Sequence, residues 1–235
     1  MPIIRIGEEI FEDYPTFVRG IVIARNVNNA GHSPQLEALV AEAIEKASSN
    51  AVDVKTDPRT VPWLEAHRTF GSNPNKFPPA HCALQKRIKK PGTRLPFISK
   101  VVTIMNLNSI RDVIPVGGDD LDRAGERLEL RYAKGDETFT PLGQPEILEH
   151  PEPGEVIYVA ADTGDIMCRR WNWRNGHNTR ITEETKTVVM NIDGLGEDSE
   201  TRAIATRDRV AKMFQDFCDA EVIVTLLSSS RNTYC

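Results

Sequence analysis

The sequence lacks the features that mark several common classes of protein. No apolar run approaches the roughly 18 residues needed to span a bilayer, and the first residues, MPIIRIGEEIFEDYP, lack the basic and apolar segments of a secretion signal. There is no P-loop, no G-x-S-x-G elbow and no dinucleotide-binding glycine pattern. We therefore expect a cytoplasmic protein that does not enter membranes and is neither an NTPase nor a serine-nucleophile enzyme.

Cysteine is scarce and scattered. Cys82, Cys168, Cys218 and Cys235 form no C-x-x-C pair, and the five histidines supply no zinc-type ligand pair with them. Free thiols in a reducing compartment are the expected state. We predict no tightly bound metal and no cofactor.

Acidic residues are absent from one long stretch. Between Ala66 and Arg111 there is no Asp or Glu but there are nine Lys or Arg residues, so the rest of the chain has 20 of the 29 basic residues against all 34 acidic ones. Four of the nine, Lys86, Arg87, Lys89 and Lys90, form what we call the basic arm. An acidic protein with one basic face can dock a polyanion there. The alternative is a solvated helical face paired with acids from elsewhere.

Hydrophobic periodicity predicts the secondary structure. Strands are expected at 3–15 and 20–29, and helices at 33–49, 57–71, 81–92 (stopped by Pro91-Gly92) and 95–114. Strands follow at 128–135, 137–142, 155–162, 165–173, 185–194 and 221–229. Between the last two lies a helix at 199–217, with Ser199 as N-cap and Ala205, Val210, Met213 and Phe214 as its apolar stripe. Helices and strands are segregated, which is typical of the α+β class.

The segment CRRWNWRNGH, residues 168–177, combines arginines and tryptophans. In a strand, Trp171 and Trp173 share one face with Arg169, and core packing is the favoured role for both tryptophans. Arg170, Asn172 and Arg174 would then share the other face with Cys168. That donor row is spaced to bind carboxylates or phosphates, although a structural salt-bridge ladder has the same pattern.

A second polar cluster spans residues 106–122. Asn106 and Asn108 interrupt an apolar segment, and Pro115 is followed by Gly117-Gly118, where the backbone can approach a ligand closely. Asp119, Asp120 and Asp122 come next; such acids can bind an ammonium group or act as a general base, but Asp at this kind of position more often caps a turn. His81 is expected to be structural or to lie at the rim of a site.

Taken together, these blocks resemble the B3/B4 tRNA-binding domain, which occurs in the beta chain of phenylalanyl-tRNA synthetase and as stand-alone proteins. The matching segments are LPFISKVVTIMNLNSI, PVGGDDLDRAGERLELRYAKGDETFTPLG, PGEVIYVAADTGDIMCRRWNWRNGHNTRIT and EETKTVVMNIDG. The resemblance implies an α+β B3/B4 fold with mixed sheets flanked by helices. We expect one domain over 1–235, matching best at about 77–194, with an N-terminal unit at 1–60 and a C-terminal helix and strand at 195–235.

The resemblance also implies proofreading. In the synthetase this domain hydrolyses the ester between a wrong amino acid and the tRNA 3′ end, and stand-alone relatives resemble editing factors that act in trans. Gly117 stands where the synthetase motif has histidine, and Asn191 where it has the glutamate that recognises a tyrosine hydroxyl; Asp120 is retained. Tyrosine-specific editing is therefore not implied. Carboxylates at Asp119, Asp120 or Asp193 would suit a polar or cationic amino acid, including arginine-like ones.

We therefore predict a trans-acting aminoacyl-tRNA deacylase that uses a positioned water and no covalent nucleophile. Alternatives are a non-catalytic RNA-binding module and a small-molecule hydrolase or amino-acid-binding protein without RNA. The partner is the aminoacylated 3′ end of tRNA, and a monomer is favoured. The predicted catalytic residues are Arg174, Asp120, Asn106 and Asn108; the substrate-binding residues are Gly117, Gly118, Asp119, Arg170, Asn172, Asn191 and Asp193; and the basic arm, Lys86, Arg87, Lys89 and Lys90, binds tRNA.

Overall fold

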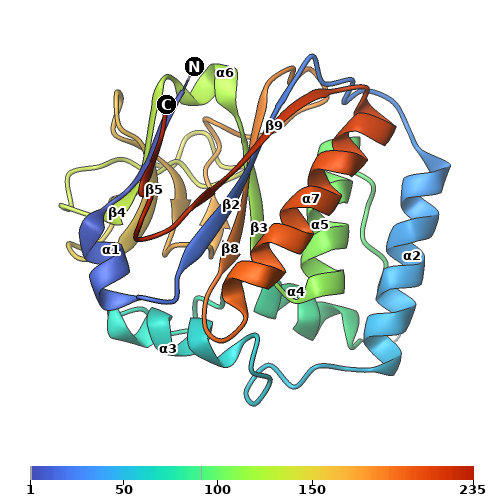
Figure 1. Ribbon diagram of the computed structural model, residues 1–235, viewed down its shortest axis with the longest axis horizontal. Helices are drawn as coiled ribbons and strands as arrows, with labels where there is room; N and C mark the ends of the chain where they lie inside the picture. The colour runs from blue at the N-terminus through green and yellow to red at the C-terminus, as the bar shows by residue number, and fades with distance from the viewer. Residues whose placement is uncertain (1, 91) are drawn as a thin grey trace.

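Three layers make up the structure: a six-stranded sheet, a four-stranded sheet and a set of helices (Figure 1). The computed structural model describes residues 2–90 and 92–235. One buried apolar cluster fills the space between the two sheets, and a second lies between the four-stranded sheet and the helices. The predicted α+β class is confirmed.

The six-stranded sheet has the order β10-β1-β4-β5-β6-β7. Its strands are β1 (Ile3–Ile6), β4 (Arg127–Tyr132), β5 (Val156–Ala160), β6 (Asp165–Arg169), β7 (Arg174–Asn175) and β10 (Thr233–Tyr234). β1 is parallel to β4 and antiparallel to β10. Residues near both ends of the chain therefore lie in the same sheet.

The four-stranded sheet is antiparallel throughout, in the order β3-β8-β2-β9. Its strands are β2 (Val18–Arg25), β3 (Val116–Asp120), β8 (Val188–Gly194) and β9 (Glu221–Leu227). Every residue of β8 is buried, as is every residue of β2 except the last. Both faces are covered, one by the other sheet and one by helices, so the strands predicted at 20–29 and 185–194 are rich in apolar residues.

Helices α2 (Pro34–Ser49), α5 (Lys100–Asp112) and α7 (Ser199–Cys218) form the outer layer (Figure 1). Ser33 and Ser99 cap α2 and α5, their hydroxyls accepting hydrogen bonds from the backbone N–H groups of Leu36 (3.3 Å) and Val102 (3.4 Å). The helices predicted at 33–49 and 95–114 are thus confirmed. None of the helices in the described ranges is long and apolar enough to cross a membrane.

Two shorter helices, α3 (Val61–Thr69) and α4 (Ala80–Ile88), confirm the predictions for 57–71 and 81–92. Trp63 of α3 is the core anchor expected from the sequence, 1 % exposed and in edge-to-face contact with Trp171 at 5.1 Å between ring centroids. Pro91, the predicted helix stop, lies outside the described residues.

Two predicted strands are wrong. The strand predicted at 3–15 ends at Ile6, and helix α1 (Glu8–Asp13) follows, with Glu8 and Glu9 in its first turn, where the helix dipole favours acids. Residues 137–142 form only isolated bridges. There the Glu137 carboxylate accepts hydrogen bonds from the backbone N–H groups of Lys134 and Gly135, which holds a turn in place of a regular strand.

The last helix differs from its prediction at two positions. The N-cap residue is Asp198, with φ 55°, and the Ser199 hydroxyl donates to the backbone carbonyl of Thr16 in place of capping the helix. Ala203, not Ala205, faces the core, because the i, i+3, i+7 stripe that contains Val210 passes through residue 203.

Candidate functional site

One cleft, about 510 Å³ in volume, gathers most of the predicted site residues. Its walls come from β3 and β8 of the four-stranded sheet, from α4 and α5, and from the turn after β6. Nine of the predicted residues line it: Arg87, Asn106, Gly117, Gly118, Asp119, Asn172, Arg174, Asn191 and Asp193. Residues separated by as many as 106 positions in sequence are thus brought to one place.

The turn after β6 corrects the prediction of a strand through residue 173. β6 ends at Arg169, and the next two residues, Arg170 and Trp171, have φ angles of 48° and 64°. Two consecutive residues in the left-handed region turn the chain, so the alternation of faces ends there. Trp171 is buried in the core as expected. Trp173 is not; it is half-buried, packs on Phe77 at 4.7 Å and lines the cleft.

Arg170 does not line the cleft. Its guanidinium lies over the ring of Phe77, 3.9 Å from the centroid, and within 3.6 Å of the Glu155 carboxylate. The Arg169 side chain beside it is held by Glu155 and Glu149 at 2.8 and 2.7 Å. For Arg170, the salt bridge that was the alternative role of the donor row is therefore the one found. Arg174 alone among the three arginines of 169–174 faces the cleft.

The Gly117-Gly118 pair lies within strand β3. The two glycines face opposite sides of the sheet. A Cβ atom at Gly117 would meet nothing within 4 Å, whereas one at Gly118 would lie 2.9 Å from Met190. Gly117 therefore leaves open space on the cleft side, and Gly118 makes room for the packing of Met190.

Asp119 is a buried carboxyl group, 3 % exposed, in the wall of the cleft. Its Oδ1 accepts a hydrogen bond from the Thr179 hydroxyl at 2.7 Å. Burial raises the pKa of Asp119 to about 7, an effect that the Thr179 hydrogen bond and the Arg19 charge only partly offset. This group can exchange a proton near neutral pH, as a general base must.

Asp193 is held in a buried ion pair that the sequence did not reveal. Arg19 of β2 donates from Nε and Nη2 to the two oxygens of Asp193 at 2.7 and 2.8 Å, and the Trp171 indole donates to the same carboxylate at 3.2 Å. The negative charge of Asp193 is therefore already matched inside the protein. The signal for Arg19 was a charged residue inside the apolar run VRGIVIA, which is costly unless the charge is paired.

Several buried polar atoms of the cleft residues have no hydrogen-bond partner among the residues that the structure describes. The donors are Arg19 Nη1 and Asn172 Nδ2, and the acceptor is Asn191 Oδ1. Burial raises the pKa of the Tyr158 hydroxyl well above its usual range, so it keeps its proton. Buried polar atoms of this kind normally have partners, so the cleft can offer both donors and an acceptor to a ligand.

A buried histidine, His67, contacts the side-chain amide of Asn172. The distance from His67 Nε2 to Asn172 Oδ1 is 3.2 Å, and the backbone carbonyl of Asn172 accepts from the Ala80 N–H at 2.9 Å. Burial lowers the pKa of His67 to about 4. His67 is therefore neutral at pH 7. In the Nε2–H tautomer it would donate to Oδ1 and leave Nδ2 free for a ligand. His81 is also fully buried, so it is not a rim residue.

Two predicted catalytic residues lie outside the cleft. Asp120 caps the short helix α6 (Leu121–Ala124), accepting from the Arg123 N–H at 3.3 Å and from the Thr185 hydroxyl at 2.7 Å. Capping was the alternative role weighed for an Asp here. Asn108 is buried in α5 and donates to the backbone carbonyl of Ile104 at 2.8 Å. Neither side chain is among the residues that line the cleft.

The basic arm is exposed at the end of α4 and just beyond it. Within residues 2–90 and 92–235, no carboxylate lies within ion-pair distance of Lys86, Arg87, Lys89 or Lys90. Acids from elsewhere in the described fold therefore do not neutralise this face. Arg87 also lines the cleft, so the arm begins at the cleft's edge.

Metal and thiol chemistry have no assembled site in the described part of the chain. Those residues include no group of three or more His, Cys, Asp or Glu side chains placed to hold a metal ion. Cys168 lines the cleft as a free thiol, and burial raises its pKa above the usual range. A neutral thiol is a poor nucleophile.

Comparison with known proteins identifies the family. The family model described as the B3/4 domain matches residues 63–227, more than half of the chain. The chain belongs to the B3/4 domain family. The match includes every residue of the cleft except Arg19.

This B3/4 domain protein is also similar to a solved structure, an N-terminal fragment of the phenylalanyl-tRNA synthetase beta-subunit from Pyrococcus horikoshii. The TM-score is 0.49 at 11 % sequence identity, over 95 % of this chain and 53 % of that one. The chain thus spans about half the length of that fragment. No curated protein matches the sequence.

Proposed function

We propose that this B3/4 domain protein hydrolyses the ester of mischarged aminoacyl-tRNA in trans. The observation that carries the proposal is Asp119: a carboxyl group whose pKa is about 7, in a cleft that also presents unpaired hydrogen-bond donors. The blocks that resemble the synthetase editing domain supply most walls of this cleft. An editing site is needed where a synthetase cannot reject a close isostere by more than a few kcal/mol.

In this mechanism a water molecule is the nucleophile. Ionised Asp119 takes a proton from the water as its oxygen bonds to the ester carbonyl carbon. Arg174 and the Asn172 amide, both lining the cleft, donate hydrogen bonds to the oxyanion that forms. The bond from the carbonyl carbon to the ribose oxygen then breaks, and the ribose oxygen takes the proton from Asp119. The products are the free amino acid and the tRNA 3′ hydroxyl.

Asp119 replaces Asp120 and Asn108 in this assignment because only Asp119 lines the cleft. Asn106, which also lines it from α5, stays assigned to the water or the α-amino group. An aminoacyl ester is already activated, so a modest base in a fixed position is sufficient.

The basic arm would hold the tRNA backbone outside the cleft. Arg87 lies at the cleft edge, and Lys86, Lys89 and Lys90 continue from it on exposed surface without ion-pair partners in the described fold. Unpaired cations on one face of an acidic protein attract phosphates and release counterions on binding. The 3′ end would pass Arg87 on its way into the cleft.

The amino acid removed would be polar or cationic. Arg19 already neutralises Asp193, so Asp119 is the acidic group of the cleft left to face a ligand. Asn191 Oδ1, unpaired among the described residues, adds an acceptor, and the protonated Tyr158 hydroxyl in the cleft lining adds a donor. A cationic side chain would bind best when Asp119 is ionised, so its removal should be favoured at higher pH.

The test is deacylation of tRNAs charged in turn with each non-cognate amino acid. We expect release of at least one polar or cationic amino acid, and we expect Arg174→Ala to slow it, with the far-ultraviolet circular dichroism spectrum unchanged because Arg174 is only half-buried. Faster release of tyrosine than of any cationic amino acid would overturn the specificity. Unchanged turnover in Arg174→Ala would remove Arg174 from the mechanism.

A second candidate is a tRNA-binding module without hydrolysis. It is favoured by Gly117 and Asn191, which replace the histidine and glutamate of the synthetase motif with groups that cannot act as acid or base. A gel shift with tRNA across salt concentrations, read beside the deacylation assay, separates the two. Binding without ester loss for every amino acid would establish the module.

A further inference from the structure

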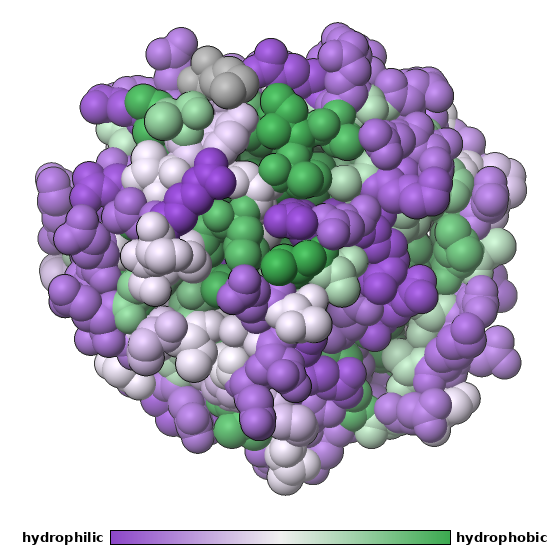
Figure 2. Space-filling model, in the orientation of Figure 1, coloured by the Kyte–Doolittle hydropathy of each residue, from purple (hydrophilic) through white to green (hydrophobic). Residues whose placement is uncertain are grey.

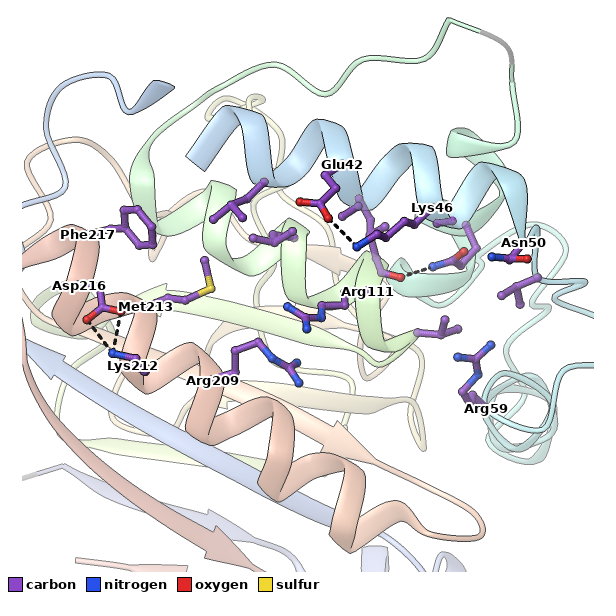
Figure 3. Close-up of a pocket in the computed structure, with 18 residues that line it drawn as sticks. Glu42, Lys46, Asn50, Arg59, Arg111, Arg209, Lys212, Met213, Asp216 and Phe217 are labelled. Carbon is purple, nitrogen blue, oxygen red and sulfur yellow. Dashed lines mark hydrogen bonds and ion pairs between the residues drawn. The ribbon is translucent and has the colours of Figure 1, made fainter. Parts of the chain in front are cut away.

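A second hollow, about 550 Å³ in volume, is lined by residues of α2, α5 and α7 (Figure 3). Helices α2 and α7 form its two sides, and both pack on α5, which forms its floor. Different residues of α5 line the two hollows. Asn106 and Ser109 line the cleft. Leu107, Ile110 and Arg111 line the second hollow, which we call the groove. The groove is thus a separate place for a ligand.

Charged side chains surround the groove, and nearly all are matched. Lys46 pairs with Glu42 at 2.5 Å and Lys212 with Asp216 at 3.0 Å, each across one helical turn on the rim (Figure 3). The two deeper arginines are matched as well. Arg59 pairs with Asp57 at 2.7 Å, and Arg209 pairs with Asp112.

Arg111 is the unmatched charge. It is exposed on the last turn of α5 and makes no hydrogen bond or ion pair with any residue in the described ranges. Its charge helps to lower the pKa of Glu42, but the Lys46 hydrogen bond is the larger cause and already engages that carboxylate. Five cations line the groove, and each of them except Arg111 has a carboxylate ion-pair partner, which leaves one unmatched positive charge at Arg111. Figure 3 shows Arg111 extending toward α7, with Arg209 opposite.

The interior of the groove is apolar. Leu107, Ile110, Val113 and Met213 are at most 8 % exposed and form its base, and Phe217 and Leu39 are half-buried at its sides. A volume of 550 Å³ falls within the range of roughly 300–1,000 Å³ typical of small-molecule sites. A stable protein partner needs about 800 Å² of surface on each side, and on the side of the molecule where Figure 1 places α2 hydrophilic residues predominate (Figure 2). A small ligand fits these features better than a protein.

We propose that this groove binds a small amphipathic monoanion, an aliphatic carboxylate. Its apolar chain lies on Leu107, Ile110 and Met213, and its carboxylate pairs with Arg111, with Arg209 on the opposite side. The ligand supplies the one negative charge that the groove lacks and removes apolar surface from water. The site is independent of the deacylase activity, because none of the residues assigned to the reaction lines it.

The test uses three soluble probes with the same chain, octanoate, octanol and octylammonium, measured by isothermal titration calorimetry. We expect octanoate to bind most tightly and octylammonium not to bind. Arg111→Gln should weaken octanoate roughly tenfold, the value of one hydrogen bond between charged groups, and should leave octanol unchanged. Because Arg111 makes no hydrogen bond or ion pair with any residue in the described ranges, the variant should unfold close to the wild-type temperature.

Two further variants complete the test. Arg5→Gln removes an exposed arginine on β1, outside the groove, and should leave octanoate affinity unchanged. Ala43→Phe places a ring in the groove from α2 and should reduce the binding of both octanoate and octanol. The proposal is overturned if octanol binds as tightly as octanoate, or if Arg111→Gln binds octanoate like the wild type. It is also overturned if octanoate at concentrations up to about 10 mM, which would reveal even weak binding, produces no heat of binding.

Discussion

Gly117 on β3 lies directly opposite Asn191 on β8 in the antiparallel register. Both residues line the cleft, and the space beside Gly117 is open for at least 4 Å around an added Cβ atom. These are the two positions at which the sequence departs from the synthetase motif. The departures are therefore neighbours in space and together shape one part of the cleft.

Gly117→Val should make the cleft more selective for small amino acids. The side chain would project into open space and suits a strand, so the free energy of unfolding should change by less than about 1 kcal/mol. In the deacylation assay, large amino acids should be released roughly tenfold more slowly or worse, with little effect on alanine. The ratio of kcat/KM values for a large and a small amino acid is the measurement.

Gly118→Ala is the matched control. Its Cβ would lie 2.9 Å from the flexible end of Met190 and 3.2 Å from Ile181, so the Met190 side chain must shift and this variant should lose about 1 kcal/mol of stability through overpacking, without a change in the ratio. If Gly117→Val slows all amino acids equally, position 117 does not line the amino-acid pocket.

Asn172 should lose part of its effect on the reaction when His67 is removed. His67 Nε2 lies 3.2 Å from Asn172 Oδ1 and fixes which end of the amide faces the cleft. We expect Asn172→Ala to lower kcat by roughly 100-fold, as for a lost oxyanion donor, and His67→Leu by on the order of tenfold through coupling. The double variant should be no slower than Asn172→Ala.

His67→Gln separates positioning from packing. A glutamine amide can still donate to Asn172, so kcat should recover relative to His67→Leu even if thermal stability does not. Equal rates for His67→Gln and His67→Leu, or a double variant slower by the product of the two effects, would show that His67 acts only in the core.

Asp119 predicts a pH dependence of the reaction. Because the pKa of Asp119 is about 7, kcat/KM should rise with pH through that value and then level off. Asp119→Asn should be slow at every pH and lack this step. A wild-type profile that is flat between pH 5.5 and 8.5 would exclude Asp119 as the base.

The same group should make stability depend on pH in a defined direction. The pKa of Asp119 is raised from an unfolded value of about 3.9, so the folded protein holds the proton more tightly than the unfolded chain does. The protonated carboxyl group therefore contributes its whole stabilising effect below pH 4. That stability is lost as pH rises toward 7, by up to about 4 kcal/mol. The free energy of unfolding can be measured by urea titration at pH 5 and pH 8. Relative to that of Asp119→Asn, the free energy of unfolding of the wild type should be lower at pH 8 than at pH 5.

The basic arm should govern the salt dependence of tRNA binding. Replacing Lys86, Arg87, Lys89 and Lys90 with Gln should reduce the slope of log Kd against log salt by roughly 3, if all four contact phosphates. As a control, Gln at the exposed cations Arg5, Arg25 and Lys55, which lie outside the arm, should leave the slope unchanged. A slope that does not differ between the two sets would place the tRNA on another face.

Local patterns in the sequence were sufficient for most of the fold. The apolar runs of β2 and β8 and most of the apolar stripe of α7 depend on neighbouring residues, so they can be read along the chain. The strand predicted through Trp173 failed because alternation continues only while φ stays negative. Nothing in the pattern announces left-handed angles at Arg170 and Trp171.

The sequence by itself determined the α+β class, the acid-free basic arm and the residue types available for chemistry, because composition and periodicity are properties of the chain alone. Only the tertiary structure decided which carboxylate could act. Asp119 and Asp120 are adjacent and chemically identical, yet one is buried in the cleft wall and the other caps α6. Burial and partners set the pKa, and both depend on residues such as Thr179 and Arg19 that are distant in sequence and meet Asp119 only in the folded protein.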